Sequence, residues 1–341
     1  MENIQFSSNQ KLNESTIYPE SQGELFQLIQ NSNKINIKEI DPITVSKERE
    51  KFSFEKGFDI RVDEINDYLI KLANKRIEWK VLKKQVIEYF NNHNIDLQEI
   101  YKWLLNNQNN SNSIFLLGYF DFYGIKTNVD YKKAFNLFLN ASEKDHIFAQ
   151  YFAGNCYQYG NGTLKNEKLA FEYFKKSANK NFTNGQLDIG YIYECGTYIQ
   201  KDLKKAVYWY EKAANNGNIM AMFNLGICHR DGIGVEKDYN KAFELFKKSA
   251  NEGCSNGINA LGYCYNVGIG IKIDMQKAFE LYQKSANLGN MEAQYNLALM
   301  YDKGEGISKD ADKAIYWYEK SAKQGHRNAQ KNLKILKINN S

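Results

Sequence analysis

The sequence predicts an all-α protein, a right-handed α-solenoid of six 36-residue helix-turn-helix repeats with an N-terminal helical cap and a C-terminal capping helix. Two observations support this prediction. Alanine recurs every 36 residues, at Ala134, Ala170, Ala206, Ala242, Ala278 and Ala314. Glycine keeps the same interval, at Gly118, Gly154, Gly190, Gly226 and Gly262, and the small residue Ala298 replaces it in the sixth copy. Two columns in phase from about residue 111 to 326 indicate one unit copied six times, which is typical of solenoids.

Each copy is predicted to form two helices, as the fourth copy illustrates. Its first helix has small and apolar residues on one face, followed by a glycine turn at residues 232–234: Ala221, Leu225, Gly226 and His229. The second helix is expected to begin at Asp238, because an aspartate accepts hydrogen bonds from the free N–H groups of a first turn and favours the positive end of the helix dipole. Aspartate recurs there as Asp130, Asp202, Asp274 and Asp310. A broad apolar stripe then indicates burial of this helix: Ala242, Leu245, Phe246, Ser249 and Ala250.

A glycine in the middle of each first helix requires an explanation. Glycine costs about 1 kcal/mol relative to alanine in a helix interior. Without a side chain at Gly226, the paired helix can place its Phe or Trp-Tyr positions directly against the first helix. We therefore predict that two backbones approach closely at this column, and that the packing offsets the propensity cost.

The flanks of the repeats are predicted separately. Residues 327–338 continue the first-helix pattern and then stop, which indicates a terminal capping helix within the repeat domain 111–338. Residues 61–110 are expected to form a helical cap, in which 77–90 resembles a degraded first helix and 99–106 a degraded second helix. Residues 1–60 have weak, mixed patterning, so mostly disorder is expected there, with one short helix near Glu24 to Ile29.

Composition and charge exclude several classes of protein. The excess of basic residues is spread over the repeats, whereas a nucleic-acid binder would gather Lys and Arg on one face. The first thirty residues have no secretory signal, and no stretch is long and apolar enough for direct membrane insertion. A cytoplasmic location is therefore expected, where the five cysteines stay reduced. Cys156, Cys228 and Cys264 lie two residues after the repeat glycine and are expected to be core residues.

The repeat pattern resembles the sel-1-like repeat family, relatives of the tetratricopeptide repeat. The pattern is A-x-x-x-L-G-x-x-Y-x-x-G-x-G-x-x-x-D-x-x-K-A-x-x-x-Y-x-K-A-A, and residues 221–250 match it best, as AMFNLGICHRDGIGVEKDYNKAFELFKKSA. The resemblance covers residues 111–338. Three residues depart from it, since Lys126 and Tyr198 replace the second turn glycine and Asn166 replaces the aspartate. The chain is also similar to the repeat region that follows kinase-like domains in some fungal proteins, and residues 87–120 look like that junction.

Two apparent catalytic motifs are explained by the repeat. His229-Arg230-Asp231 spells the start of a kinase catalytic loop, but Glu236 stands where a magnesium-binding Asn is needed, and His229 occupies a column of tyrosines. The Gly-x-Gly turns could suggest a phosphate site. Their recurrence in copy after copy instead indicates a connector, and the four histidines lack metal-ligand spacing. We expect no cofactor, no metal and no catalytic residue.

Function is therefore expected to lie in a surface. The tetratricopeptide analogy implies that first helices line a concave groove, with the positions three before, one after and four after the glycine pointing into it. These positions hold aromatic and amide groups with isolated charges: Tyr151, Asn155, Gln158, Leu187, Tyr191, Glu194, Phe223, Ile227, Arg230, Asn259, Tyr263, Asn266, Tyr295, Leu299 and Asp302. Such a mixture suits a bound peptide or protein helix. The alternative for each aromatic residue is packing between neighbouring repeats.

The resemblance implies a non-enzymatic interaction scaffold or adaptor with a protein or peptide partner, and the fungal kinship suggests signalling. The first alternative is a regulatory subunit of a membrane-associated enzyme, because family members are linked to chitin synthase activation and to degradation of endoplasmic-reticulum proteins. A prenylated activator would end in a C-a-a-X box, whereas this sequence ends Ile338-Asn339-Asn340-Ser341. The second alternative is a hydrolase, since some secreted bacterial relatives are linked to β-lactam binding or cleavage. The paired cysteines of those relatives and an S-x-x-K element are missing here.

Overall fold

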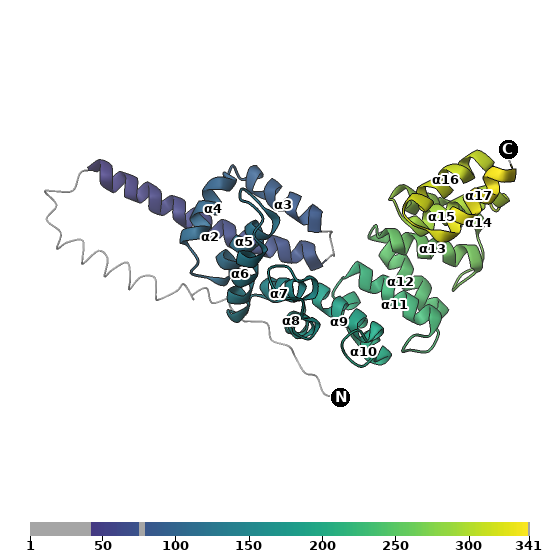
Figure 1. Cartoon of the computed structure of the whole chain (residues 1–341), viewed down its shortest axis with the longest axis horizontal. Helices are drawn as coiled ribbons and strands as arrows, with labels where there is room; N and C mark the ends of the chain where they lie inside the picture. The colour runs from purple at the N-terminus through teal and green to yellow at the C-terminus, as the bar shows by residue number, and fades with distance from the viewer. Residues whose placement is uncertain (1–41, 75–78, 340–341) are drawn as a thin grey trace, which may run out of the picture. The chain divides into compact units, whose positions relative to one another are not determined.

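The computed structural model describes residues 42–74 and 79–339. Within these ranges the chain forms sixteen α-helices and no β-strand, which confirms the predicted all-α class (Figure 1). The chain divides into two compact units at Gly57, and the unit from Gly57 onward holds all six repeats. Apart from the first part of one helix, the features described below belong to this second unit.

The six repeats each contribute two helices of 13 residues, as the sequence predicts. The first helices are α5 (Ser111–Tyr123), α7 (Ile147–Tyr159), α9 (Thr183–Cys195), α11 (Ile219–Asp231), α13 (Ser255–Val267) and α15 (Met291–Lys303). The second helices are α6 (Tyr131–Glu143), α8 (Glu167–Asn179), α10 (Leu203–Asn215), α12 (Tyr239–Asn251), α14 (Met275–Asn287) and α16 (Ala311–Lys323). Each helix packs chiefly against the helix before it and the helix after it.

Four helices flank the repeats. Three precede them, α2 (Pro42–Asn74), α3 (Trp79–Asn92) and α4 (Leu97–Asn106), and α17 (Arg327–Asn339) follows. Helix α4 packs on α5, and α17 packs on α16, as expected of terminal helices that cover exposed ends of a stack. The predicted helices at 77–90, 99–106 and 327–338 therefore correspond closely to α3, α4 and α17.

Residues 42–60 differ from the sequence-based expectation, because they are helical and not disordered. One face of α2 explains the difference, since it is buried against the rest of the unit: Phe58, Val62, Ile65, Leu69 and Ala73. Once that part of the helix is packed, each further residue adds a hydrogen bond without a new nucleation cost. The helix extends back to Pro42, a residue suited to a first helical position. The helix expected near Glu24 to Ile29 lies outside the described residues.

The turn between the paired helices follows the predicted chemistry. In the fourth repeat, Gly232 ends α11 in the left-handed backbone region with φ 75°. Asp238 then begins α12, and its carboxylate accepts the Lys241 N–H at 2.8 Å. The equivalent aspartates of the other repeats accept in the same way, and Asn166 does so at 3.0 Å despite the substitution. The aspartate column is therefore confirmed as a set of helix N-caps.

The mid-helix glycine brings the two helices of a repeat together. A Cβ atom on Gly226 would lie only 2.6 Å from Cε1 of Phe246 in the paired helix, which is closer than side chains approach. The ring at this second-helix position is fully buried in every repeat: Phe138, Phe174, Tyr210, Phe246, Tyr282 and Tyr318. Burying such a ring contributes about 1.5–3 kcal/mol, more than the propensity cost of about 1 kcal/mol for glycine. The predicted close approach is confirmed.

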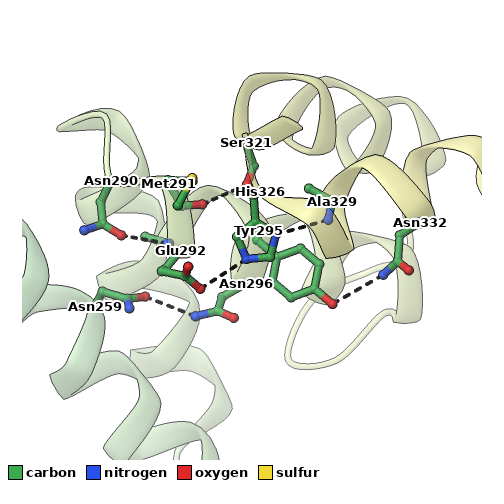
Figure 2. A network of polar contacts seen from close by, with 11 residues as sticks. Asn259, Asn290, Met291, Glu292, Tyr295, Asn296, Ser321, His326, Ala329 and Asn332 are labelled. Atoms are coloured by element: carbon green, nitrogen blue, oxygen red, sulfur yellow. Dashed lines mark hydrogen bonds and ion pairs between the residues drawn. The ribbon is translucent and has the colours of Figure 1, made fainter. Parts of the chain in front are cut away.

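Several neighbouring repeats are joined at the residue that begins the first helix, although Phe182 and Cys254, which begin α9 and α13, make no side-chain cap hydrogen bond. His326 accepts the Ala329 N–H through Nδ1 at 3.1 Å, while its Nε2 lies 3.2 Å from the Glu292 carboxylate of the preceding repeat (Figure 2). Asn290 likewise caps α15 through Oδ1 and donates through Nδ2 to Asn256 at 2.7 Å. One side chain thus both begins a helix and connects it to the repeat before.

His146 begins α7 in the same way, but its polar contact reaches α2 and its ring contacts the first repeat. Its Nδ1 accepts the Ala149 N–H at 3.1 Å, its Nε2 lies 3.3 Å from the Asn66 amide oxygen of α2, and its ring stacks on Phe115. Burial lowers the pKa of His146 to about 3, and the positive charge of Lys180 contributes in the same direction. The folded protein therefore holds this imidazole in its neutral form.

The apolar core is denser in aromatic rings toward the N-terminus. One continuous cluster of buried side chains extends from Phe58 in α2 to Trp209 in α10. Within it the rings of Phe115, Phe138, Phe148 and Phe152 contact one another, with centroid separations of 5.0–6.3 Å. Three smaller clusters follow, in which alanine, leucine and cysteine accompany only one or a few rings each. The early repeats accordingly share a more continuous core than the later ones.

We expect Gly226→Leu to lower the melting temperature, because the new side chain must displace Phe246 and overpacking costs about 1–3 kcal/mol. Gly57→Leu is the matched control, since this helical glycine is exposed and a Cβ added to it would have no other atom within 4 Å. The control should melt at or slightly above the wild-type temperature. Circular dichroism measures all three, and equal melting of Gly226→Leu and wild type would contradict the close approach.

His146 also makes stability depend on pH. Its folded pKa of about 3 lies below its unfolded value near 6.5, so its contribution is complete above pH 6.5 and is lost as pH falls toward 3. Between pH 7 and 5 the loss amounts to about 2 kcal/mol. His146→Asn keeps a capping oxygen, as in Asn290, but does not titrate. Urea unfolding should therefore show a shallower acid slope for His146→Asn, and identical slopes would sink this assignment.

Candidate binding surface

The predicted column three residues before the glycine lies at the junctions between repeats. Tyr151 and Leu187 are buried there, at 5% and 1% exposure. The Tyr151 ring contacts Phe174 and Phe182, and its hydroxyl donates to the Asp188 carboxylate of the next first helix at 2.8 Å. Tyr151 is thus a packing residue, which is the alternative that the sequence leaves open.

The later members of this column have the same role. Tyr295 stacks on His326 with ring centroids 4.3 Å apart, and its hydroxyl accepts from Asn332 at 3.5 Å (Figure 2). Asn259 accepts from Asn296 of the next repeat at 3.1 Å. The remaining member, Phe223, packs on the Phe246 ring of its own repeat. This column therefore stabilises the stack and offers little free surface.

In the column four residues after the glycine, most side chains form hydrogen bonds within their own repeat. The Tyr210 hydroxyl donates to Glu194 at 2.6 Å, and the Tyr318 hydroxyl donates to Asp302 at 3.3 Å. Burial, and then the hydrogen bond to Glu194, raise the pKa of Tyr210 well above its ordinary value. The sequence analysis did not predict this tyrosine–acid hydrogen bond. The sequence does indicate it, because both acids occur in repeats whose buried second-helix ring is a tyrosine.

Arg230 of this column also has a partner within its own repeat. Its guanidinium donates twice to the adjacent Asp231 carboxylate, with both distances 2.7 Å. This pair raises the pKa of Arg230 and lowers that of Asp231. Asn266 and Gln158, the two amides of this column, are half-buried. Their uncharged groups are the part of the column that remains for recognition.

The column that follows the glycine directly is the most exposed of the three. Tyr191 is 56% exposed and Tyr263 is 40% exposed. Asn155 is half-buried and donates to the Tyr151 carbonyl oxygen at 3.2 Å, while Ile227 and Leu299 are half-buried apolar residues. The aromatic faces of Tyr191 and Tyr263 are therefore available to a partner.

The structure adds Tyr159, which is 67% exposed and was not among the predicted site residues. It lies five residues after the repeat glycine, so the repeat register could have found it. We use the name tyrosine stripe for three exposed tyrosines, one each from α7, α9 and α13, together with three half-buried amide residues of α7 and α13. Its members are Tyr159, Tyr191, Tyr263, Asn155, Gln158 and Asn266.

The chemistry of the tyrosine stripe suits binding. Tyrosine supplies a large, rigid contact area with a hydroxyl at its end, and carboxamides can both donate and accept hydrogen bonds. Among the described residues no group of three or more His, Cys, Asp or Glu could hold a metal ion. None of the helices in the described ranges has both the length and the apolar character needed to cross a bilayer.

The His229-Arg230-Asp231 motif does not assemble a catalytic group. His229 is buried at 5% exposure, and its ring nitrogens are closed off from solvent. Burial is the main cause that lowers its pKa, and Lys241 acts in the same direction, while Asp238, Glu211 and a hydrogen bond with the Glu236 backbone act against it. Arg230 and Asp231 bind each other, so the motif offers no activated base or nucleophile.

Comparison with known proteins supports the repeat assignment. Six segments match the family model described as Sel1 repeat, at residues 111–146, 147–182, 183–218, 219–254, 255–290 and 292–326. A Sel1 repeat protein from Oxalobacter formigenes is 34% identical with a TM-score of 0.60, over 64% of this chain and 86% of that one. Comparison with curated proteins gives no match.

A second solved structure is c5321, a protective antigen present in uropathogenic Escherichia coli strains that displays an SLR fold. It is 30% identical with a TM-score of 0.62, and the alignment covers 70% of this chain and 51% of that one. This chain therefore spans about half the length of the antigen. Both similarities support the arrangement of the helices.

Removal of single hydroxyls should separate packing tyrosines from surface tyrosines. We expect Tyr151→Phe to destabilise the protein by about 1–2 kcal/mol, because a part-buried hydrogen bond to the Asp188 carboxylate is lost. Tyr191→Phe is the matched control, since its ring is 56% exposed, and it should change stability by less than about 0.5 kcal/mol. Urea unfolding of both variants measures the difference. Equal effects would show that exposure does not distinguish these residues.

Proposed function

The chain belongs to the Sel1 repeat family, whose repeats typically serve as protein-interaction scaffolds, and on that premise we propose that it is a non-enzymatic scaffold or adaptor. In this proposal a protein or peptide lies along the first helices and contacts the tyrosine stripe. The single observation behind it is that Tyr159, Tyr191 and Tyr263 stay exposed, at 67%, 56% and 40%, in a fold that buries most of its aromatic rings.

The charges around the stripe suggest what kind of segment would bind. Glu194 and Asp302 accept hydrogen bonds from buried tyrosines, and Arg230 is paired with Asp231. A partner would therefore meet aromatic faces and carboxamides, beside the carboxylates of Glu194 and Asp302, which keep their negative charge. We propose a segment that stacks on the tyrosines and forms hydrogen bonds with the amides.

The proposal includes a cytoplasmic location, which is supported by the five cysteines, all of them free thiols. A role as regulatory subunit of a membrane-associated enzyme would require recruitment through such a partner. The stripe would then be the contact that recruits it. Fractionation of native extract would test that version directly.

A pair of matched double variants tests the proposed function. Tyr191→Ala with Tyr263→Ala removes two rings of the stripe, whereas Tyr208→Ala with Tyr316→Ala removes two second-helix tyrosines of similar exposure, 49% each. Each variant is first shown by circular dichroism to fold as wild type does. Proteins captured from native extract are then identified by mass spectrometry.

We expect at least one captured protein to be lost with the stripe variant and retained with the second-helix variant. For a purified partner, loss of two exposed hot-spot tyrosines should weaken binding by about tenfold or more. Capture that is unchanged by the stripe variant, or reduced equally by both variants, would contradict the assignment of the partner to the first helices.

A further inference from the structure

Basic side chains are concentrated in the last turn of α16 and in α17. The last acidic residue of the sequence is Glu319, and the six basic residues after it are Lys320, Lys323, Arg327, Lys331, Lys334 and Lys337. The 39 basic residues before them are balanced by 40 acidic residues. The basic excess is therefore local, which corrects the expectation that it is spread over the repeats.

Helix α17 follows the first-helix pattern of the repeats but has the opposite charge. The six first helices of the repeats together contain six acidic and two basic residues, whereas α17 contains four basic residues and no acidic one. Arg327 occupies the first position, where the helix dipole disfavours a positive charge. Arg327, Lys331 and Lys334 are like charges at spacings of four and three residues, which destabilise a helix. A soluble cap needs polar groups of either sign, so a single sign points to a negatively charged partner.

The face of α17 that carries these cations is uncovered. Lys334 lies in the column of the repeat glycine, against which a second-helix ring packs in the repeats. Within the described residues no second helix follows α17 (Figure 1), and the side chains of Arg327, Lys331 and Lys334 are exposed. The opposite side of the helix packs on α16 and contains the buried residues Ala329 and Leu336.

Two isoleucines lie among the cations. Ile335 is 48% exposed and Ile338 is 72% exposed, and Ile338 follows Lys334 by one helical turn. We use the name basic face for Arg327, Lys331, Lys334, Ile335 and Ile338. In the described part of the chain the three cations of this face have no carboxylate partner, whereas Lys337 beside them is bound to Glu319 at 2.7 Å. The basic face thus combines unpaired positive charge with exposed apolar groups.

A membrane surface that contains anionic lipids fits the basic face better than a nucleic acid or an acidic protein segment does. Proteins that bind single-stranded nucleic acids combine basic groups with aromatic side chains that stack on bases, and α17 has no aromatic residue. The face of a single helix is convex, so it offers a peptide no groove. Anionic headgroups attract clusters of basic residues. The isoleucines can enter the interface while the long basic side chains keep their charges at the phosphates.

We propose that the basic face of α17 binds the surface of membranes that contain anionic phospholipids, with the helix lying in the plane of the headgroups. The contact is peripheral, because the buried side of α17 stays packed on α16. Such binding is reversible and selects no particular protein. It therefore adds to recruitment through the partner of the tyrosine stripe and does not replace it.

Co-sedimentation of the full chain with vesicles tests this proposal. One kind of vesicle is pure phosphatidylcholine, and the other contains about 30% phosphatidylserine. We expect the protein to sediment only with the second kind, and to be released when NaCl is raised from about 0.1 M to about 0.5 M, because salt screens such contacts. Equal sedimentation with both kinds of vesicle, or sedimentation with neither, would overturn the proposal.

Two matched double variants locate the contact. Lys331→Gln with Lys334→Gln should weaken binding to the phosphatidylserine vesicles by about tenfold or more, because each basic residue near the surface contributes to the attraction. Lys247→Gln with Lys248→Gln removes two exposed lysines of α12 and should bind as wild type does. Equal weakening by both variants would show that net charge, and not the basic face, is responsible.

A variant that keeps every charge separates a membrane from other negatively charged partners. Ile335→Ser with Ile338→Ser, shown by circular dichroism to fold as wild type does, should bind the phosphatidylserine vesicles about threefold or more weakly. Soluble polyuridylate or polyglutamate, at a charge equal to that of the lipid, should not displace the wild-type protein. Unchanged binding of the serine variant, or displacement by either polymer, contradicts a lipid partner.

The tyrosine stripe provides an independent control. Tyr191→Ala with Tyr263→Ala leaves α17 intact and should bind the vesicles as wild type does. The outcome of the vesicle experiments is therefore separate from the outcome of the capture experiment that tests the proposed function. Loss of vesicle binding in this folded variant would place the lipid contact on the first helices of the repeats and would contradict its assignment to α17.

Discussion

The structure depends on the close approach of the two helices in each repeat. A glycine, or Ala298 in the last repeat, faces a second-helix ring that is fully buried, as Gly226 faces Phe246. Because that ring is held between two backbones, it sets where the neighbouring side chains lie. In two of the three repeats where it is a tyrosine, Tyr210 and Tyr318, its hydroxyl reaches an acid four residues after the small residue. One contact thus determines the environment of several columns.

The junctions between repeats depend on a second contact, in which one side chain has two roles. A histidine or asparagine begins a first helix and also bonds to the preceding one, as His326 and Asn290 do. Where such a residue is present, the start of the helix depends on its neighbour, which couples repeats that otherwise fold by local contacts. Toward the N-terminus aromatic packing adds to this coupling, and His146 there is stacked on Phe115. The junctions therefore differ in the residue that begins the helix and in how much apolar packing supports them.

The candidate binding residues lie at positions that take part neither in the packing of the glycine against the ring nor in the junctions between repeats. Tyr191 and Tyr263 follow the glycine and remain exposed, so they are available for recognition. Repeat four departs from its neighbours, because His229 and Val207 are smaller than the tyrosine and phenylalanine at the same positions in repeats three, five and six.

The all-α class, the six repeats, the helix starts at residues such as Asp238 and the close approach at Gly226 can be predicted from the sequence, because they follow from spacing along one helix pair. Which outward residues are free depends on contacts between repeats that the spacing does not reveal. Tyr151 and Tyr191 are both tyrosines of first helices, yet the first donates to Asp188, 37 residues away, and the second is exposed. The helicity of residues 42–60 was likewise decided by burial of the adjoining face of α2. Periodicity specifies which face of a helix a residue occupies. Whether its side chain is buried or exposed depends on the size and hydrogen-bonding groups of a neighbour that folding brings near.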